Sequence, residues 1–307
     1  MILSNESNES EKEASAMDFN SLPKRRRLLS IKNSQKLMFT LLGSSAVFIF
    51  VLLLTFMIIL IVNGVQGLSF RLIFMPPGPE VEWSIRPAIG GTILLIIGAV
   101  GIALPLGLAA AIYLNEYATE GKIVAIVNQG INNLAGVPSV VFGIFGYSFF
   151  VLVLGMGKSL LAACFTLACM ILPTIIRTSQ EALKTIPSDY REGSLALGAT
   201  KWQTLRYVIL PAATPGISTG VILALGRAAG ETAAILFVGA SLGVPAFSGF
   251  LERFPALSFQ LYMMAISAPS STRNIQWAIA LVLVLIVFAF NLVAIIIRNR
   301  SEKFQRK

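Results

Sequence analysis

Long uncharged runs of apolar residues constrain this chain more than any other feature. A helix needs about 18–20 mostly apolar residues to cross the hydrocarbon core of a bilayer. Six runs reach that length, and charged residues make up only 13% of the chain, against roughly 25% in soluble domains. The sequence therefore predicts an all-α integral membrane protein with a six-span domain over residues 37–297. The expected spans are residues 37–62, 88–114, 134–154, 159–176, 214–240 and 275–297.

The distribution of basic residues predicts the orientation of these spans. Lysine and arginine gather in the cytoplasmic loops of membrane proteins. With both termini in the cytoplasm, 18 of the 24 lysines and arginines fall on the cytoplasmic side, and Arg227 lies within a span. The net charge of +9 therefore reflects membrane topology, and we expect no nucleic-acid partner. The expected cytoplasmic segments are residues 1–36, 115–122, 177–206 and 298–307.

Both ends of the chain differ in composition from the membrane domain. Residues 1–20 are rich in Ser, Asn and Glu, which predicts a disordered cytoplasmic tail, and a basic cluster at residues 24–27 follows within residues 1–36. The first apolar run is much longer than the 7–15 residues of a signal-peptide core, so we expect an uncleaved first helix. Residues 298–307 are expected to form a basic cytoplasmic tail.

Residues 188–211 form a polar segment between two predicted spans. Their local signals predict two short helices with a glycine corner, held outside the bilayer on the cytoplasmic side. A membrane protein that keeps such a segment is expected to present it to a partner. The signals are the capping-box pairs Asp189/Glu192 and Thr200/Gln203, the helix-ending Gly198, and the helix-stopping Pro187 and Leu210-Pro211.

Several kinds of chemistry are excluded. The chain has no histidine, and Cys164 and Cys169 lie in one apolar run, where they indicate small core residues. Gly157-Lys158-Ser159 resembles the end of a phosphate-binding loop, but that loop needs a glycine where Leu152 stands. We therefore expect no enzyme activity, catalytic residue, metal site or cofactor in this chain, so any ATP must be used by a partner.

The predicted fifth span carries both small and charged residues. Gly216, Gly220, Gly226 and Gly230 form two G-x-x-x-G pairs, a spacing that lets helix backbones approach closely. Arg227 lies in the middle of the span, and Glu231 follows one turn later, close enough to pair with it on a helix. Such charges either lock helices together or line the path of a polar permeant. An arginine fork suits phosphate-like oxyanions.

Other polar residues near the span ends have two interpretations. Arg177 follows the fourth span, where it serves either as a cytoplasmic orientation signal or as an exit-side anion contact. Asn132, Asn133 and Ser139 flank the start of the third span. They either line a polar path or serve in capping and interhelical hydrogen bonds.

The polar segment resembles the EAA loop of ABC-importer permeases, whose pattern is E-A-A, three residues, G, and later I-x-L-P. Glu192, Gly198 and the sequence Val208-Ile209-Leu210-Pro211 fill this pattern. Gly193-Ser194 replaces the two alanines. Both replacements are small, so a helix face that fits a groove is kept, although Gly193 should weaken the helix by up to ~1 kcal/mol relative to Ala.

The resemblance extends over roughly residues 64–297 and is to the A-type permease subunits of phosphate-specific ABC importers. It implies six spans in a MetI-like arrangement in the bacterial plasma membrane. It also implies a C-type permease partner, two copies of a cytoplasmic ATPase and an external phosphate-binding protein. The motifs that carry it are residues 110–117, 133–143, 172–178 and 226–232.

The same resemblance assigns roles to individual residues. Motion of the coupling segment would pass directly into the span that carries Arg227. The implied ATPase-coupling residues are Asp189, Glu192, Gly193, Ser194, Gly198 and Ala199; the implied pathway residues are Arg227, Glu231 and Arg177, with Asn133 and Ser139 as further lining.

Three other functions remain open from the sequence. The same machinery could carry phosphonate, sulfate or molybdate. An ion-coupled secondary transporter is the alternative from another class; such transporters often show internal repeats, and no clear repeat is present here. The third is a membrane subunit that signals phosphate status without transport.

Overall fold

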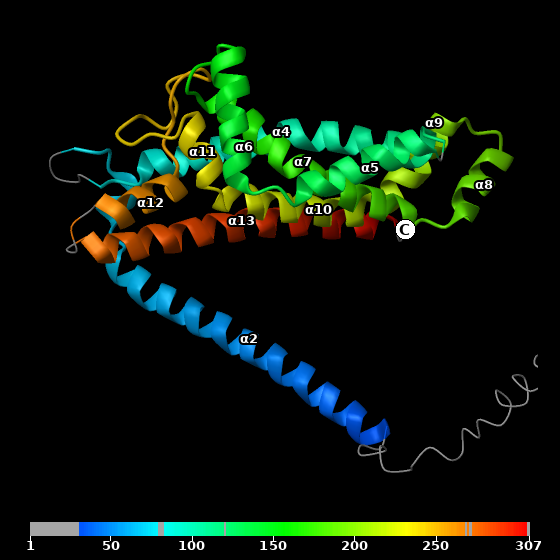
Figure 1. Cartoon of the computed structure of the whole chain (residues 1–307), viewed down its shortest axis with the longest axis horizontal. Helices are drawn as coiled ribbons and strands as arrows, with labels where there is room; N and C mark the ends of the chain where they lie inside the picture. Colours follow the sequence, from blue (N-terminus) through cyan, green and yellow to red (C-terminus); the bar gives the residue numbers. More distant parts are fainter. Residues whose placement is uncertain (1–30, 79–82, 120, 268, 270–271, 306–307) are drawn as a thin grey trace, which may run out of the picture. The chain divides into compact units, whose positions relative to one another are not determined.

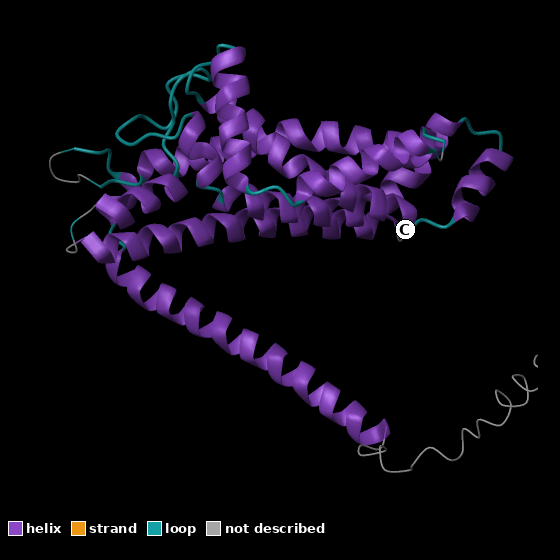
Figure 2. Ribbon diagram, viewed as in Figure 1, coloured by secondary structure: helices purple, strands orange, loops and turns teal. Residues whose placement is uncertain are grey.

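The computed structural model of the chain describes residues 31–78, 83–119, 121–267, 269 and 272–305. Helices joined by loops make up this described part (Figures 1 and 2). The predicted disordered tail, residues 1–20, and the basic cluster lie outside it. Contacts divide the chain into two units, Met1–Ile58 and Ile59–Lys307. Every helix that begins after residue 67 belongs to the second unit.

The helices follow the order of the predicted spans, with shorter helices between them. Three π-helical turns, η2, η3 and η4, continue α-helices without a break. The elements are α2 (Ile31–Gly67), α3 (Phe70–Phe74), α4 (Arg86–Ile112), η2 (Tyr113–Tyr117), α5 (Lys122–Ala135), α6 (Ser139–Gly146), η3 (Tyr147–Val153), α7 (Leu160–Lys184), α8 (Ser188–Ala196), α9 (Lys201–Thr204), η4 (Leu205–Ile209), α10 (Leu210–Gly230), α11 (Ala233–Val238), α12 (Leu257–Ser267) and α13 (Arg273–Gln305).

Among the described residues, five helices are long and apolar enough to cross a membrane, and a sixth span is counted if the bent pair formed by α5 and α6–η3 is one span. That pair bends by 102°. Pro138 predicts an early break in the third span, residues 134–154, and the structure confirms that break: Leu134 belongs to α5, and the next helix starts at Ser139. Pro138, with ψ 142°, holds extended backbone just before α6, as proline disfavours a continuous helix.

The fifth span also differs from its prediction. A single helical run extends from Lys201 to Gly230. Pro211 lies within this run, just after the π-helical turn η4. The predicted stop at Leu210-Pro211 is therefore absent, and the helix changes from the π-helical turn η4 to α10 at this point. The span then ends at Gly230, ten residues before the predicted boundary. Glu231 is extended, and α11 begins after it.

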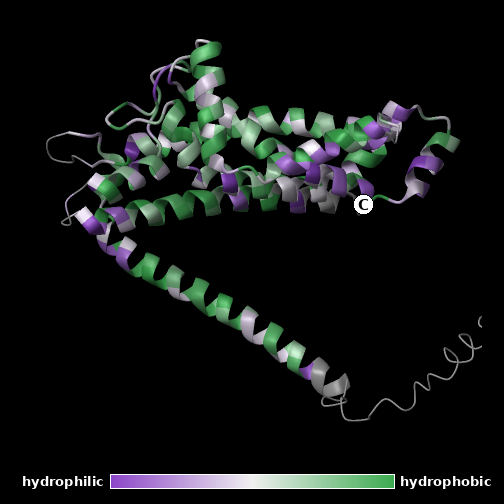
Figure 3. Cartoon of the chain, in the orientation of Figure 1, coloured by the Kyte–Doolittle hydropathy of each residue, from purple (hydrophilic) through white to green (hydrophobic). Residues whose placement is uncertain are grey.

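The central helix of the second unit is α7, which packs against both α4 and α10. Its contact with α4 is close because Gly107 leaves room for Ile175. Cys164 is buried here and Cys169 is partly buried, and both are free, which confirms their interpretation as core residues. Figure 3 shows hydrophobic residues along α4 and α13, and hydrophilic patches where α8 and α9 lie.

One of the two predicted glycine pairs serves close packing. Gly216 lies against Ala182 of α7, and Gly220 lies against Thr178, whose side chain occupies the space of the absent Cβ. Gly226 and Gly230 face open space in the described structure. The first pair therefore joins α10 to α7, whereas the second leaves a smooth face near Arg227.

We predict that Gly220→Ala destabilises the purified chain by ~1–3 kcal/mol, because the added methyl group overpacks the contact with Thr178. Thermal unfolding in detergent micelles measures the change. The matched control is Gly226→Ala, whose new methyl group meets nothing within 4 Å and should not lower the melting temperature. Equal effects of the two variants would contradict the packing assignment.

Candidate functional site

The polar segment forms two short helices joined at a glycine corner, as its sequence predicts. Gly198 has φ +84°, a left-handed conformation that glycine adopts without strain. Leu197 precedes it and is 91% exposed. The corner therefore projects an apolar side chain into solvent at the tip of α8.

The predicted capping box at Asp189 and Glu192 is wrong. The residue that caps α8 is Pro187, which makes no side-chain cap hydrogen bond, and Asp189 lies inside the first turn. A carboxylate there still favours the helix through its dipole. Glu192 is consequently left exposed and available to a partner.

The second capping box, at Thr200 and Gln203, is confirmed. The Gln203 backbone N–H donates to Thr200 Oγ1 at 3.3 Å, and the Thr200 N–H donates to Gln203 Oε1 at 2.8 Å. Ser194, one of the two departures from the EAA pattern, shares a hydrogen bond of 2.9 Å with Thr204. The hydroxyl therefore ties α8 to α9 in a way that alanine could not.

Sequence reasoning missed an ion pair at the base of α8. Arg191 Nη2 donates to Glu116 Oε1 at 2.7 Å, and Nε donates to Oε2 at 3.1 Å. The guanidinium also donates to the backbone carbonyls of Leu183 at 3.0 Å and Ile186 at 2.9 Å. The hydrogen bonds to Glu116, and the charge of that carboxylate, raise the pKa of Arg191 above its ordinary value. The available signal was a basic residue in one cytoplasmic segment and an acidic residue in another.

A small cavity of about 160 Å³ adjoins this ion pair. Its polar lining comes from both members of the pair and from Lys201. Leu195 of α8 and Leu205 of η4 supply apolar walls. The space between α8 and the start of the fifth span is thus only partly filled by side chains.

Arg227 lies in the last turn of α10, where the partial negative charge of the helix end stabilises a cation. The predicted i, i+4 ion pair with Glu231 does not form, because Glu231 has φ −72° and ψ 129° and has left the helix. Arg191 and Glu116 form the one ion pair found among the described residues. The interpretation of Arg227 and Glu231 as an ion pair that locks helices together is therefore not supported.

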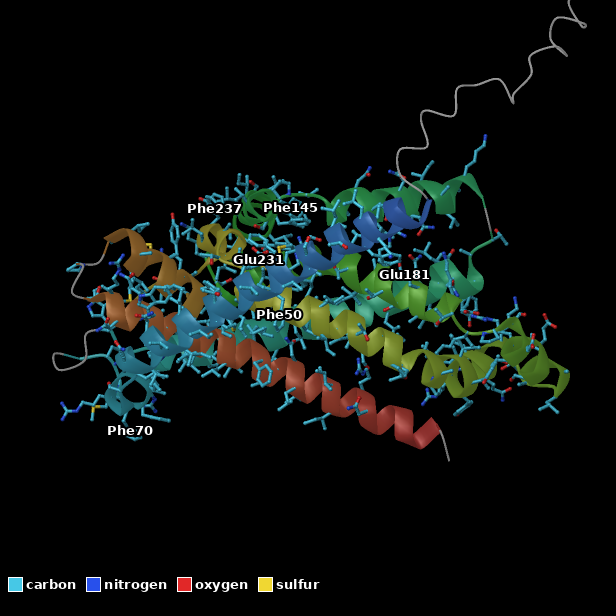
Figure 4. All side chains as sticks on the ribbon, turned by 90° about the horizontal axis from the view of Figure 1, so that it is seen from below. Phe50, Phe70, Phe145, Glu181, Glu231 and Phe237 are labelled. Carbon is cyan, nitrogen blue, oxygen red and sulfur yellow. The ribbon has the colours of Figure 1, made fainter. Side chains whose placement is uncertain are left out.

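The break at Glu231 is covered by neighbouring elements. Ser258 of α12 donates its hydroxyl to the Glu231 carbonyl at 2.8 Å. Gly143 of α6 lies against Ala233 and Phe237 of α11. Figure 4 shows Glu231 in the same region as Phe237 and Phe145. The interrupted parts of spans three and five therefore meet close to this break.

The remaining candidate residues are spread over three helices. Arg177 is partly buried on α7, next to the Thr178 that contacts Gly220. Arg227 follows Gly220 by seven residues, ~10 Å along the helix, so these two arginines occupy different levels of the bundle.

The asparagines do not gather around Arg227 in the contacts found among the described residues. Asn132 and Asn133 are exposed on α5, where Asn133 accepts a hydrogen bond from Gln129 at 3.1 Å. Ser139 opens α6 and is partly buried. Among the coupling residues, Gly193 is open on α8 and Ala199 follows the corner, partly buried.

Comparison with known proteins identifies similar sequences and folds. Residues 103–307 match the family model described as binding-protein-dependent transport system inner membrane component. The phosphate transport system permease protein PstA 1 of Mycobacterium tuberculosis (strain ATCC 25618 / H37Rv) is 34% identical over 223 residues, which cover 71% of each chain. The phosphate transport system permease protein PstA of Yersinia pestis is 35% identical over 246 residues, covering 79% of this chain and 82% of that protein.

The fold also resembles a solved transporter. The chain matches a subunit of the MetNI methionine ABC transporter in an inward-facing conformation, with a TM-score of 0.57 and 20% identity, over 71% of this chain and 95% of that chain. At this identity the likeness concerns the fold, and it confirms the expected MetI-like arrangement.

We predict opposite effects of alanine at two glycines of the polar segment. Gly193→Ala should stabilise α8 by up to ~1 kcal/mol, since this glycine is helical and meets nothing within 4 Å. Gly198→Ala should destabilise the corner by ~1–2 kcal/mol, because its φ is +84°. Amide hydrogen exchange of residues 188–204 measures both. Protection that changes in the same direction in both variants would contradict the geometry described.

Proposed function

This chain belongs to the family of binding-protein-dependent transport system inner membrane components, and on that premise we propose that it conducts inorganic phosphate into the cytoplasm. The family makes it a permease subunit of an ABC importer and not itself an enzyme. The phosphate assignment is supported by relatives named as phosphate transport permeases that are 34% and 35% identical over most of the chain.

The proposed assembly places the chain beside a C-type permease subunit in the plasma membrane. Two copies of a cytoplasmic ATPase dock on the permease pair, and an external binding protein delivers phosphate. Both termini lie in the cytoplasm, as the basic residues predict. The outer segments 63–87 and 241–274 are the candidates for contact with the binding protein.

One observation carries the proposed mechanism: the coupling segment continues into the pathway residue without a break. The helical run from Lys201 to Gly230 includes Arg227. Arg227 lies 26 residues beyond Lys201, or ~39 Å at 1.5 Å per residue. Motion imposed on α9 by ATP-driven closure of the ATPases therefore reaches Arg227 through one continuous helical run, to which α8 is linked by the Ser194–Thr204 hydrogen bond.

The surroundings of Arg227 support an anion path. An arginine within the bilayer costs roughly 2.5–3.5 kcal/mol or more unless it has a role or a partner. Its predicted partner Glu231 is extended and forms no ion pair with it among the described residues. Gly226 and Gly230 leave open space beside it, and its planar fork suits the oxygens of phosphate.

The docking face is supported by exposed side chains around the glycine corner. Leu197 is 91% exposed and Tyr190 is 53% exposed on α8. Burying an exposed apolar side chain in a partner is favourable because it removes apolar surface from water. We assign Leu197 as the anchor that enters the ATPase.

Replacing Leu197 by Asp should release the ATPase, since a charge would then enter an apolar groove. The permease itself should keep its melting temperature, because the leucine is almost entirely exposed. Co-purification of the ATPase with tagged permease measures docking. Unchanged ATPase stoichiometry would remove Leu197 from the docking face.

The transport assignment is tested with Arg227→Gln in proteoliposomes that hold the complete complex. We expect normal assembly and ATPase docking but a loss of phosphate uptake of at least ~100-fold, the size seen when a charged contact worth ~3 kcal/mol is removed. Arg227→Lys keeps the charge without the planar fork and should retain part of the uptake. Lys122→Gln, which removes an exposed cation from α5, is the control.

Normal phosphate uptake by Arg227→Gln would end the pathway role of this residue. Competition by phosphonate, sulfate and molybdate in the unmodified complex decides the identity of the anion. Uptake that needs a proton or sodium gradient and no ATP would contradict the whole proposal.

A further inference from the structure

The docking helix α8 is positioned without any buried side chain of its own. None of its residues, Ser188–Ala196, is buried in the described structure. Hydrophobic burial is the usual means of holding a helix in place. Since α8 lacks it, the polar contacts of this helix must fix its position relative to the spans.

Those contacts connect α8 to two sides of the bundle. Ser194 connects it to Thr204, in the helix that becomes the fifth span. Arg191 connects it to Glu116, which ends the second span, and to the Leu183 carbonyl near the end of α7. The arginine uses both edges of its guanidinium, with Nε, Nη1 and Nη2 all donating.

We propose that Arg191 and Glu116 form a clamp that makes α8 move together with the cytoplasmic ends of spans two and four, so that force from the ATPase reaches α4 and α7 as well as α10. This inference rests on the proposed function. It assigns Arg191 and Glu116 as positioning residues that act on transport through the docking helix.

The geometry suits transmission of force. A guanidinium that grips a carboxylate with two parallel bonds fixes orientation as well as distance. The two side chains are only 26% and 16% exposed, so competing water is limited. Beyond the clamp, α4 and α7 are packed tightly where Gly107 meets Ile175. Movement of their ends would therefore carry into both spans.

The clamp predicts a defect different from loss of docking. The surface around Leu197 does not include Glu116, so a permease with a broken clamp still binds the ATPase and supports ATP hydrolysis. It loses the transfer of motion to spans two and four. Phosphate transported per ATP hydrolysed should therefore fall.

The experiment uses the complete complex in proteoliposomes and compares Glu116→Gln with the unmodified permease. We expect unchanged ATPase stoichiometry and hydrolysis, and a decrease of about tenfold in phosphate taken up per ATP, the factor expected from one lost charge-assisted hydrogen bond. Arg191→Lys keeps the positive charge but loses the planar fork, so it should also lower the phosphate taken up per ATP. It serves as the second variant if Glu116→Gln does not fold. The matched control is Glu181→Gln, an exposed glutamate of α7 (Figure 4) that forms no ion pair among the described residues, and its ratio should stay unchanged.

The double variant Glu116→Arg with Arg191→Glu separates the pair from its members. Recovery of the ratio above that of either single variant supports the clamp, because the swapped charges can pair again. An unchanged ratio in Glu116→Gln and Arg191→Lys overturns it. If the unmodified complex takes up no phosphate, the proposed function fails, which is a separate outcome from failure of the clamp.

Discussion

The structure depends on one constraint of the bilayer: every backbone N–H and C=O within it needs a partner from the protein itself. Long helices meet this need internally, and five of them do so in the described part of the chain. The constraint makes each interruption significant. At Glu231 the freed carbonyl accepts from Ser258, and Gly143 allows α6 to cover the start of α11. Irregular backbone is thus kept where the protein surrounds it, which is also where membrane transporters place their substrates.

Outside the bilayer the stabilising forces change. The spans are held by apolar and small-residue packing around α7, with Gly107, Gly216 and Gly220 setting the close approaches. The helix α8 has no buried residue, and polar contacts hold it: the Arg191–Glu116 ion pair, the bonds from Arg191 to two backbone carbonyls, and the Ser194 hydroxyl contact. Directional bonds hold orientation where little apolar area is available.

The sequence predicted the features that follow from local rules. Apolar run length predicted most spans, and capping chemistry predicted the Thr200 box and the Gly198 corner. It did not predict the features that depend on contacts between residues far apart in the chain. No proline marks the end of the helix at Glu231, and the break is stabilised by Ser258, 27 residues away. The Arg191–Glu116 pair joins residues 75 positions apart. The capping role predicted for Asp189 was wrong for a local reason, because Pro187 occupies the N-cap position of α8.

The unbroken run from Lys201 to Gly230 has a geometric consequence for the amount of motion required. A rigid rod amplifies a small rotation at one end into a larger displacement at the other. Tilting this helix by about 10° around Lys201 would shift Arg227 sideways by about 7 Å, against a separation of about 8–10 Å between packed helices. A slight change in angle at the membrane surface is therefore enough to move a cation sideways by most of the distance between two packed helices.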